Sequence, residues 1–153
     1  MTDNVLKAAD IMTRDVITVT PETSVEELGR LFIERDISGA PVVDSEGRLV
    51  GIVTENDLIK KERPFHIPTI IRIFDAIIPI ESDSRVEEEI KKMTATTVQD
   101  ICTRDVITVD VHTTLPEIAE IMTEKGVHLL PVMDGDRLVG IIGKKDVIRA
   151  ISG

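Results

Sequence analysis

Aromatic residues are nearly absent from this chain: they form 2% of the sequence, with three Phe, no Trp and no Tyr. Aromatic stacking is therefore largely unavailable for ligand binding, and the core must be packed by Ile, Val and Leu, which suit buried strands. The single cysteine, Cys102, has nothing to pair with inside the chain. Basic residues are also few: the chain has 18 Lys and Arg and 28 Asp and Glu, which gives a net charge of -10. This balance argues against nucleic acid and anionic membranes as partners.

Long apolar runs and leader segments are missing as well. No run approaches the ~18 residues of a membrane-spanning helix, and no secretory signal precedes Ala8. A chain of 153 residues is long enough to bury a sizeable core in one domain or two small ones. We therefore expect a reduced, soluble, cytoplasmic protein.

Catalytic and metal-binding motifs are not found in the sequence. His66, His112 and His128 lack ligand partners at helical spacing. There is no phosphate-binding loop that ends in Gly-Lys-Ser or Gly-Lys-Thr, and there is no nucleophile elbow. The sequence thus predicts a protein that is not an enzyme and that requires no cofactor or metal.

The chain does contain an internal duplication. Three stretches occur twice in the same order: ADIMTRDVITV (9–19) and QDICTRDVITV (99–109), SGAPVVD (38–44) and HLLPVMD (128–134), GRLVGIVTENDLIK (47–60) and DRLVGIIGKKDVIR (136–149). The second copy is one residue shorter in the turn before its third stretch.

Cys102 takes the place of Met12, so we expect it to be a small core residue rather than a nucleophile.

Each copy predicts a short lead-in helix followed by the order β-α-β-β-α. Thr23 or Ser24 can cap the first long helix, and Thr114 can cap its counterpart. Apolar residues then recur at helical spacing in both copies: Leu28, Leu31 and Phe32, and Ile118, Ile121 and Met122. Neither copy could cover its sheet alone. The expected fold is therefore α/β (α+β), with repeats at 8–61 and 98–153 related by pseudo-two-fold symmetry and a mostly helical insert at 62–97.

The insert occurs once and is unusually apolar for a linker. Pro68 can start a short helix that Pro79 ends, and Ser84 begins a capping box for a second helix. We expect the segment from Ile67 to Ile80 to cover the module or a partner subunit, with membrane contact as the alternative.

The duplicated motifs resemble a pair of cystathionine-β-synthase (CBS) domains, or Bateman module, of the stand-alone bacterial or archaeal type. The resemblance is carried by the Pro-Val-Val-Asp or Pro-Val-Met-Asp hairpin and by a Gly-hydrophobic-hydrophobic-x-x-x-Asp ending at Asp57 and Asp146. It implies a sensor that binds an adenosine compound, AMP, ADP or ATP, between the two copies. It also implies a homodimer that reports to an unidentified client protein.

The start of the last helix in each copy offers groups that suit such a ligand. The unpaired N–H groups of a helix start favour phosphate, and a carboxylate can accept hydrogen bonds from the 2′- and 3′-hydroxyls of ribose. Thr54 and Asp57 supply a hydroxyl and a carboxylate in the first copy. The structural alternative is that Thr-x-x-Asp is nearly a capping box, which occurs without any ligand.

The second copy differs at this point, because Gly143 replaces Thr54 while Asp146 stays. A capping box would lose half of its basis there, because the N-cap hydroxyl is missing. A role of Asp146 as acceptor for ribose hydroxyls would not depend on that hydroxyl. Lys144 and Lys145 oppose the helix dipole, a cost that a bound anion would relieve; the alternative is two solvated lysines. As a hypothesis, the Asp146 site prefers the more heavily phosphorylated ligands.

The resemblance further implies crossed sites, in which the walls come from the other copy. The Asp57 site would gain Thr103, Val106, Val127, His128 and Leu129, and the Asp146 site would gain Thr13, Val16, Ile37, Ser38 and Gly39. The alternative for His128 is a partly buried structural role, and for Gly39 a role in the hairpin. The repeated Arg14 and Arg104 either contact phosphates or pair with surface acids.

Two other functions stay open. The module could be a constitutive dimerisation scaffold with vestigial sites, which the missing hydroxyl at Gly143 favours. It could also bind S-adenosylmethionine or a cyclic dinucleotide in the same place.

Overall fold

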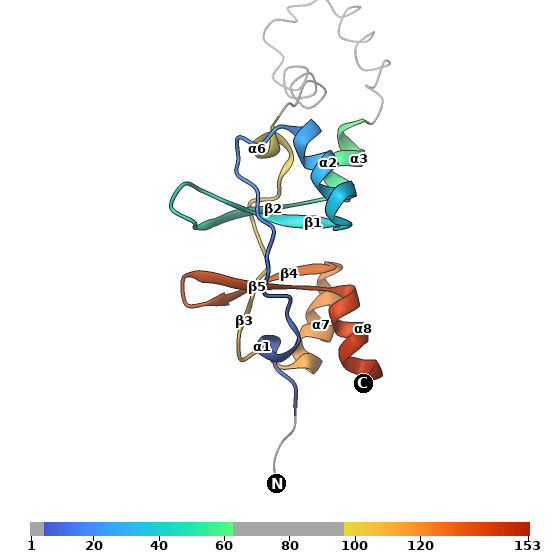
Figure 1. Cartoon of the computed structure of the whole chain (residues 1–153). Helices are drawn as coiled ribbons and strands as arrows, with labels where there is room; N and C mark the ends of the chain where they lie inside the picture. The colour runs from blue at the N-terminus through green and yellow to red at the C-terminus, as the bar shows by residue number, and fades with distance from the viewer. Residues whose placement is uncertain (1–4, 63–96) are drawn as a thin grey trace, which may run out of the picture.

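Two units of similar fold lie one above the other in this computed structural model, which describes residues 5–62 and 97–153 (Figure 1). The first repeat unit holds α2 (Val25–Arg35), β1 (Gly39–Val43), β2 (Leu49–Thr54) and α3 (Glu55–Lys61). The second repeat unit holds β3 (Val109–Asp110), α7 (Leu115–Lys125), β4 (Leu129–Asp134), β5 (Arg137–Gly143) and α8 (Lys144–Ser152). Short lead-in helices precede them in the sequence: α1 (Ala8–Ile11) and α6 (Val98–Ile101). The predicted mixed helix–strand class is confirmed.

The two long helices begin at the predicted type of cap. In α2 the hydroxyl of Ser24, not that of Thr23, accepts the N–H of Glu27 at 3.1 Å. In α7 the carboxylate of Glu117 accepts the N–H of Thr114 at 3.0 Å. This hydrogen bond favours the charged carboxylate and therefore lowers the pKa of Glu117.

Antiparallel hairpins form the centre of both units: β1 pairs with β2, and β4 pairs with β5. Each hairpin has an irregular register at the equivalent place, after Val42 and after Val132. The second turn is shorter, as its sequence predicts, and Gly135 takes a φ of 64° there. Glycine, which has no Cβ, adopts this left-handed backbone without strain.

The predicted first strand of each copy is present only at its end. In the second unit, β3 pairs in parallel with β4. In the first unit, an isolated bridge from Val19 to Val42 stands in the same place. The N–H of Val19 donates to the carbonyl of Pro41 at 3.0 Å, and the N–H of Val43 donates to the carbonyl of Val19 at 2.9 Å.

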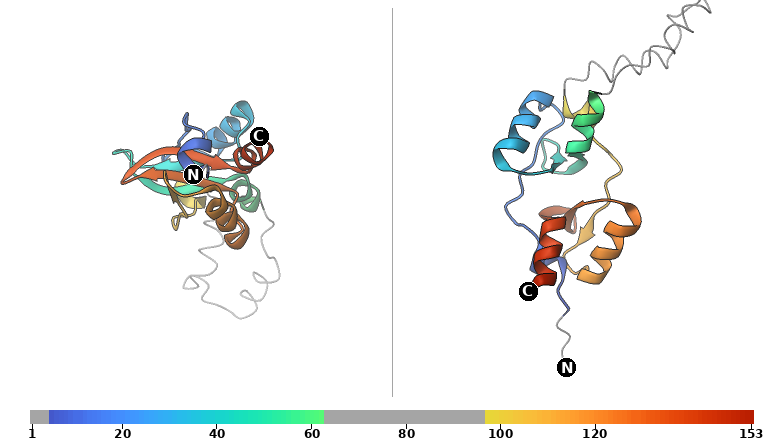
Figure 2. Two further views of the ribbon diagram at one scale, coloured as in Figure 1. Left: turned by 90° about the horizontal axis from the view of Figure 1, so that it is seen from below. Right: turned by 90° about the vertical axis from the view of Figure 1, so that its right-hand side faces the viewer.

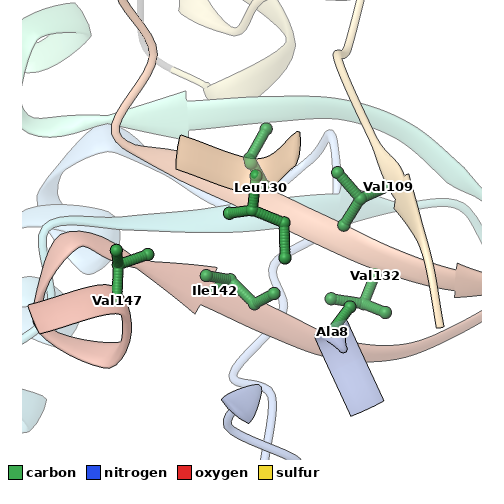
Figure 3. Close-up of a cluster of buried hydrophobic side chains, with 7 residues drawn as sticks. Ala8, Val109, Leu130, Val132, Ile142 and Val147 are labelled. Atoms are coloured by element: carbon green, nitrogen blue, oxygen red, sulfur yellow. The ribbon is translucent and has the colours of Figure 1, made fainter. Parts of the chain in front are cut away.

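Each lead-in helix packs against the core of the other copy. Figure 3 shows Ala8 of α1 among the buried side chains of the second repeat unit, where its N–H donates to the carbonyl of Thr113 at 2.7 Å. Val98 of α6 belongs to the buried cluster of the first repeat unit, and its N–H donates to the carbonyl of Thr23 at 2.8 Å. The two sequence repeats are thus not separate bodies in space, because each completes the core of the other.

Aliphatic side chains fill both cores, as the composition requires. The side chains that are fully buried include Leu28, Val42, Val53 and Val98 in the first core and Ile118, Leu130, Val132 and Ile142 in the second. Burial of one such side chain stabilises the fold by ~1.5–3 kcal/mol relative to leaving it exposed.

The helices α2, α3, α7 and α8 all lie on the same side of the hairpins. Figure 1 shows α2 and α3 above α7 and α8 on this side, and the right-hand view of Figure 2 looks directly onto it. These helices carry four isoleucines that are between 60% and 82% exposed: Ile33, Ile59, Ile148 and Ile151.

No helix within the described ranges is both long and apolar enough to cross a membrane. The helices predicted after Pro68 and after Ser84 lie outside the described residues. The same holds for the whole Ile67 to Ile80 segment, so its proposed covering role stays a prediction.

Candidate functional site

Each hairpin passes into its closing helix without an intervening loop. β2 ends at Thr54 and α3 starts at Glu55, while β5 ends at Gly143 and α8 starts at Lys144. The last strand residue is therefore also the N-cap of the helix, and its backbone is extended in both copies. We call these two places the Thr54 junction and the Gly143 junction.

A carboxylate three residues further on holds the N-cap of each junction in the same way. The N–H of Thr54 donates to Oδ2 of Asp57 at 2.8 Å, and the N–H of Gly143 donates to Oδ2 of Asp146 at 2.8 Å. The second copy thus lacks the hydroxyl half of a capping box, as predicted, but the half that Asp146 supplies persists because its partner is a backbone N–H. Capping by itself gives a structural reason for both carboxylates.

The other carboxylate oxygen distinguishes the two junctions. Oδ1 of Asp146 accepts hydrogen bonds from the hydroxyl of Thr13 and from Nη1 of Arg149, both at 3.1 Å. Oδ1 of Asp57 has no hydrogen-bond partner among residues 5–62 and 97–153, and the Thr54 hydroxyl lies 3.4 Å from Oδ2. Since each carboxylate oxygen can accept about two hydrogen bonds, Asp57 keeps one whole oxygen open.

The lead-in segments reach the junction of the other copy, which is the crossed arrangement that the resemblance implies. The backbone of Thr13 pairs with Ile141 in β5 through hydrogen bonds of 2.8 and 2.9 Å, and that of Thr103 pairs with Ile52 in β2 through two of 2.9 Å. The structure thus brings Thr13 into contact with Asp146. Thr103 lies beside the strand that ends at the Thr54 junction, without a hydrogen bond to Asp57 in the described part of the chain.

Two strand glycines allow this close approach. A Cβ added at Gly51 would lie 3.0 Å from the carbonyl oxygen of Thr103 and 3.1 Å from Sγ of Cys102. A Cβ added at Gly140 would collide with the side chain of Met12. Cys102 packs against the first core, as predicted, and this burial raises the pKa of its thiol.

Gly39 and Leu129 occupy equivalent places in the two copies and meet across the interface between them. A Cβ added at Gly39 would lie 2.7 Å from Cδ2 of Leu129 and 2.9 Å from the carbonyl oxygen of Val53. Cδ1 of Leu129 lies 3.6 Å from the position of a Cβ at Gly143. Gly39 therefore has a packing reason for its missing side chain, which is the room that Leu129 needs.

The other apolar residues that the resemblance implies for the walls of the two sites differ in their packing. Ile37 packs against the core of the first unit, and Val127 packs against the core of the second. Val16 and Val106 are half-buried. No observation tests whether these four residues contact a ligand, and that role stays a prediction.

The polar wall residues Ser38 and His128 are both exposed. A partly buried structural role for His128 is therefore wrong. The carbonyl of Ser38 accepts the N–H of Glu55 at 2.9 Å, so the chain before β1 is tied to the first turn of α3 in its own copy. We predicted Ser38 at the Asp146 site, and the structure leaves that ligand contact untested.

The basic residues near the junctions are exposed. Lys144 and Lys145 form no ion pair with any residue of the described ranges. The guanidinium of Arg14 donates to the carbonyl of Ala9 at 3.1 Å, which is neither of its two predicted roles, and Arg104 is exposed. Within the described ranges, no group of three or more His, Cys, Asp or Glu side chains could hold a metal ion.

Arg149 is the residue at these junctions that the sequence reasoning missed. Its Nη1 lies 3.1 Å from Oδ1 of Asp146, and its side chain is 72% exposed while that of Asp146 is 11% exposed. The signal was present in the sequence, because residues three apart on a helix are neighbours and an Asp followed by an Arg at that spacing can form an ion pair.

Known proteins match this chain over both copies. Residues 8–63 and 98–153 match the family model of the CBS domain. MJ1426 of Methanocaldococcus jannaschii is 30% identical over an alignment that spans 93% of this chain and 89% of that protein. The chloroplastic CBS domain-containing protein CBSX1 of Arabidopsis thaliana is 32% identical, over 95% of this chain and 64% of its own length. This chain spans 23% of the inosine-5′-monophosphate dehydrogenase of M. jannaschii, at 32% identity.

Solved structures agree with this one over nearly the whole chain. CBSX2 of A. thaliana in complex with AMP has a TM-score of 0.75 and 27% identity, over 96% of each chain. The CBS domain pair of MJ0100, in complex with 5′-methylthioadenosine and S-adenosyl-L-methionine, has a TM-score of 0.72 and 25% identity, over 97% of this chain and 98% of that one. MJ1225 of M. jannaschii reaches 0.73 and 34% identity, over 97% of this chain and 49% of that one.

Proposed function

Because this chain belongs to the CBS domain family, we propose that it senses an adenine nucleotide, AMP, ADP or ATP, whose ribose hydroxyls bind Asp57 or Asp146. Two observations support this proposal: an aspartate lies at each strand-to-helix junction, and each lead-in segment pairs with the strand of the other copy. The protein acts in this proposal as a regulatory module without catalysis of its own, and the hydroxyl, carboxylates and lysines of its junctions serve to bind the ligand.

The open oxygen of Asp57 is the observation that carries the proposal. Oδ2 is held by the N–H of Thr54 at 2.8 Å, which fixes the carboxylate, while Oδ1 has no partner in the described ranges. A half-buried carboxylate that keeps one oxygen free is able to accept both hydroxyls of a vicinal diol. A cap alone would need only the oxygen that is already used.

The Gly143 junction favours the phosphate end of a ligand. Lys144 and Lys145 occupy the first turn of α8, a helix of 9 residues, and neither is paired in the described part of the chain. Their charges and the N-terminal dipole of the helix both attract an anion. The hypothesis that the Asp146 site prefers ATP to AMP rests on these two lysines.

Two relatives bear on the choice of ligand. AMP is bound to CBSX2, and 5′-methylthioadenosine and S-adenosyl-L-methionine are bound to the CBS pair of MJ0100. All three compounds contain adenosine, so a diol acceptor would serve each of them. S-Adenosylmethionine is therefore the second candidate ligand, and the two lysines beside Asp146 favour the phosphorylated compounds over this cation.

We also propose that two copies assemble through the helical side and report to a client protein. The four exposed isoleucines of α2, α3 and α8 support this surface, because they lie on helices that share one side of the molecule. Light scattering of the wild type and of Ile59→Glu tests it. A dimer that becomes a monomer in the variant supports the surface, and a monomeric wild type contradicts it.

A thermal-shift panel tests the nucleotide proposal. AMP, ADP, ATP and S-adenosylmethionine are compared with 2′,3′-dideoxyadenosine monophosphate, which keeps the base and phosphate of AMP but lacks the diol. A specific ligand at 100-fold its dissociation constant stabilises the folded state by about 2.7 kcal/mol. We expect a shift with AMP and little or none with the dideoxy compound. Equal shifts would rule out the diol as the recognised group, and no shift with any compound would favour the scaffold function.

A further inference from the structure

We infer that Arg149 competes with the ligand's ribose for Asp146, so that the two sites are unequal and the Asp57 site binds adenosine, which carries no phosphate, more tightly. This inference rests on the proposed function, since it concerns how the same two carboxylates receive a ribose diol. Two observations carry it. Thr13 and Arg149 donate hydrogen bonds to Oδ1 of Asp146, whereas Oδ1 of Asp57 has no hydrogen-bond partner within the described residues.

The number of free acceptor positions differs between the two carboxylates. A vicinal diol donates two hydrogen bonds, and an ionised carboxylate offers about four lone-pair positions. At Asp146, the N–H of Gly143, the hydroxyl of Thr13 and the guanidinium of Arg149 occupy three positions. One position is left, which is too few for both ribose hydroxyls.

At Asp57 the same count leaves two positions. The N–H and the hydroxyl of Thr54 both lie on Oδ2, at 2.8 and 3.4 Å, and Oδ1 has no partner in the described ranges. Lys60 stands where the second copy has Arg149, and it forms no ion pair with Asp57 in the part of the chain that the structure describes. Release of Arg149 would give Asp146 the same two free positions.

Arg149 is well placed to be released when a ligand arrives. Its side chain is 72% exposed, whereas the carboxylate that it pairs with is only 11% exposed. Ion pairs with an exposed partner are weak and are screened by salt. The competition therefore lowers the affinity of the Asp146 site by up to about fivefold rather than closing it.

Calorimetry with adenosine tests this competition, because adenosine carries the diol but no charge. Asp57→Ala leaves the Asp146 site alone, and we compare it with Asp57→Ala/Arg149→Ala. The matched control compares Asp146→Ala with Asp146→Ala/Lys60→Ala, which removes an equivalent charge that has no ion pair with any described residue. We expect the Arg149 substitution to tighten adenosine binding by about two- to fivefold and the Lys60 substitution to leave it unchanged.

Two further readouts separate competition from a general effect on the fold. Rising salt should tighten adenosine binding to the Asp146 site and leave the Asp57 site unchanged, since within residues 5–62 and 97–153 only the former has an ion pair to screen. Lys60→Arg in the Asp146→Ala background should weaken the Asp57 site, because it introduces the competitor there.

The outcomes distinguish this inference from the proposed function. An equal or lower affinity after removal of Arg149, including no measurable binding in either variant of the pair, overturns the competition. If the double variant Asp57→Ala/Asp146→Ala binds adenosine as well as the wild type does, the carboxylates are not the ligand site and the proposed function itself fails.

Discussion

The two repeat units have the same order of helix, hairpin and closing helix, and they differ in the polar groups around their carboxylates. Both junctions join strand to helix directly, and both hold the N-cap N–H on an aspartate at 2.8 Å. Among the residues that the structure describes, only the second has an arginine and a threonine on the remaining carboxylate oxygen. The comparison teaches that the buried residues and the strand glycines fix where the carboxylates lie. The exposed positions around them are free to diverge, and they decide what each carboxylate can accept.

Removal of an equivalent core side chain from each unit should have the largest effect. Leu28→Ala and Ile118→Ala each empty a fully buried position, and each should lower the free energy of unfolding by ~2–5 kcal/mol. Because the lead-in helices are exchanged, both substitutions should shift one common transition in urea. Two separate transitions, only one of which moves, would show that the units unfold independently.

The contact between Gly39 and Leu129 offers the next test. Gly39→Ala places a Cβ 2.7 Å from Cδ2 of Leu129 and should cost ~1–3 kcal/mol of stability through overpacking. The cost should be smaller in a Leu129→Ala background, although the carbonyl of Val53 at 2.9 Å still opposes the methyl group. Equal costs in the two backgrounds would exclude Leu129 as the cause.

The hairpin turns should respond differently to loss of their first aspartate. Oδ1 of Asp44 accepts the N–H groups of Glu46 and Arg48, both at 2.9 Å, whereas the carboxylate of Asp134 accepts no hydrogen bond in the described ranges. The hydrogen bond from Arg48 and the one from Glu46 lower the pKa of Asp44. Asp44→Ala should therefore destabilise the protein more than Asp134→Ala.

The lowered pKa of Asp44 also predicts how the difference in stability between Asp44→Ala and Asp134→Ala depends on pH. A carboxylate with a lowered folded pKa contributes stability that is present above its unfolded value of about 3.8 and is lost as the pH falls toward the folded value. The two variants should therefore converge in stability below pH 3.8, as measured by thermal unfolding across pH. A difference that persists unchanged in acid would contradict this origin.

Exchange of the N-cap residues between the junctions should have the smallest effect. Both aspartates bind the backbone N–H, so Thr54→Gly should cost only a few tenths of a kcal/mol, and Gly143→Thr should gain a similar amount. Chemical denaturation of the two variants measures this. A loss above about 1 kcal/mol for Thr54→Gly would show that the hydroxyl matters to the cap itself.

The sequence predicted the fold more fully than the site. Duplicated motifs, helix caps such as Ser24 and Thr114, and the shortened second turn are local patterns, and local patterns can be read directly. The exchange of α1 and α6 between the cores was not visible, because Ala8 and Val98 carry no sign of which core they enter. At the junctions, the positions of Asp57 and Asp146 were predictable from spacing.

The partners of those carboxylates were less predictable. The capping bond to the N–H of Gly143 forms without an N-cap hydroxyl, so the Thr-x-x-Asp pattern does not report it. The contact between Thr13 and Asp146 joins residues far apart in the sequence and came only from the resemblance. The packing of Leu129 against Gly39 depends on how the two units stack, which no local pattern encodes.

A crystal structure of the protein with AMP tests the central claim most directly. The account predicts both ribose hydroxyls within roughly 2.5–3.0 Å of Oδ1 of Asp57, while Oδ2 keeps its hydrogen bond to the N–H of Thr54. A nucleotide whose ribose lies away from Asp57 and Asp146, with both aspartates serving only as caps, would contradict it.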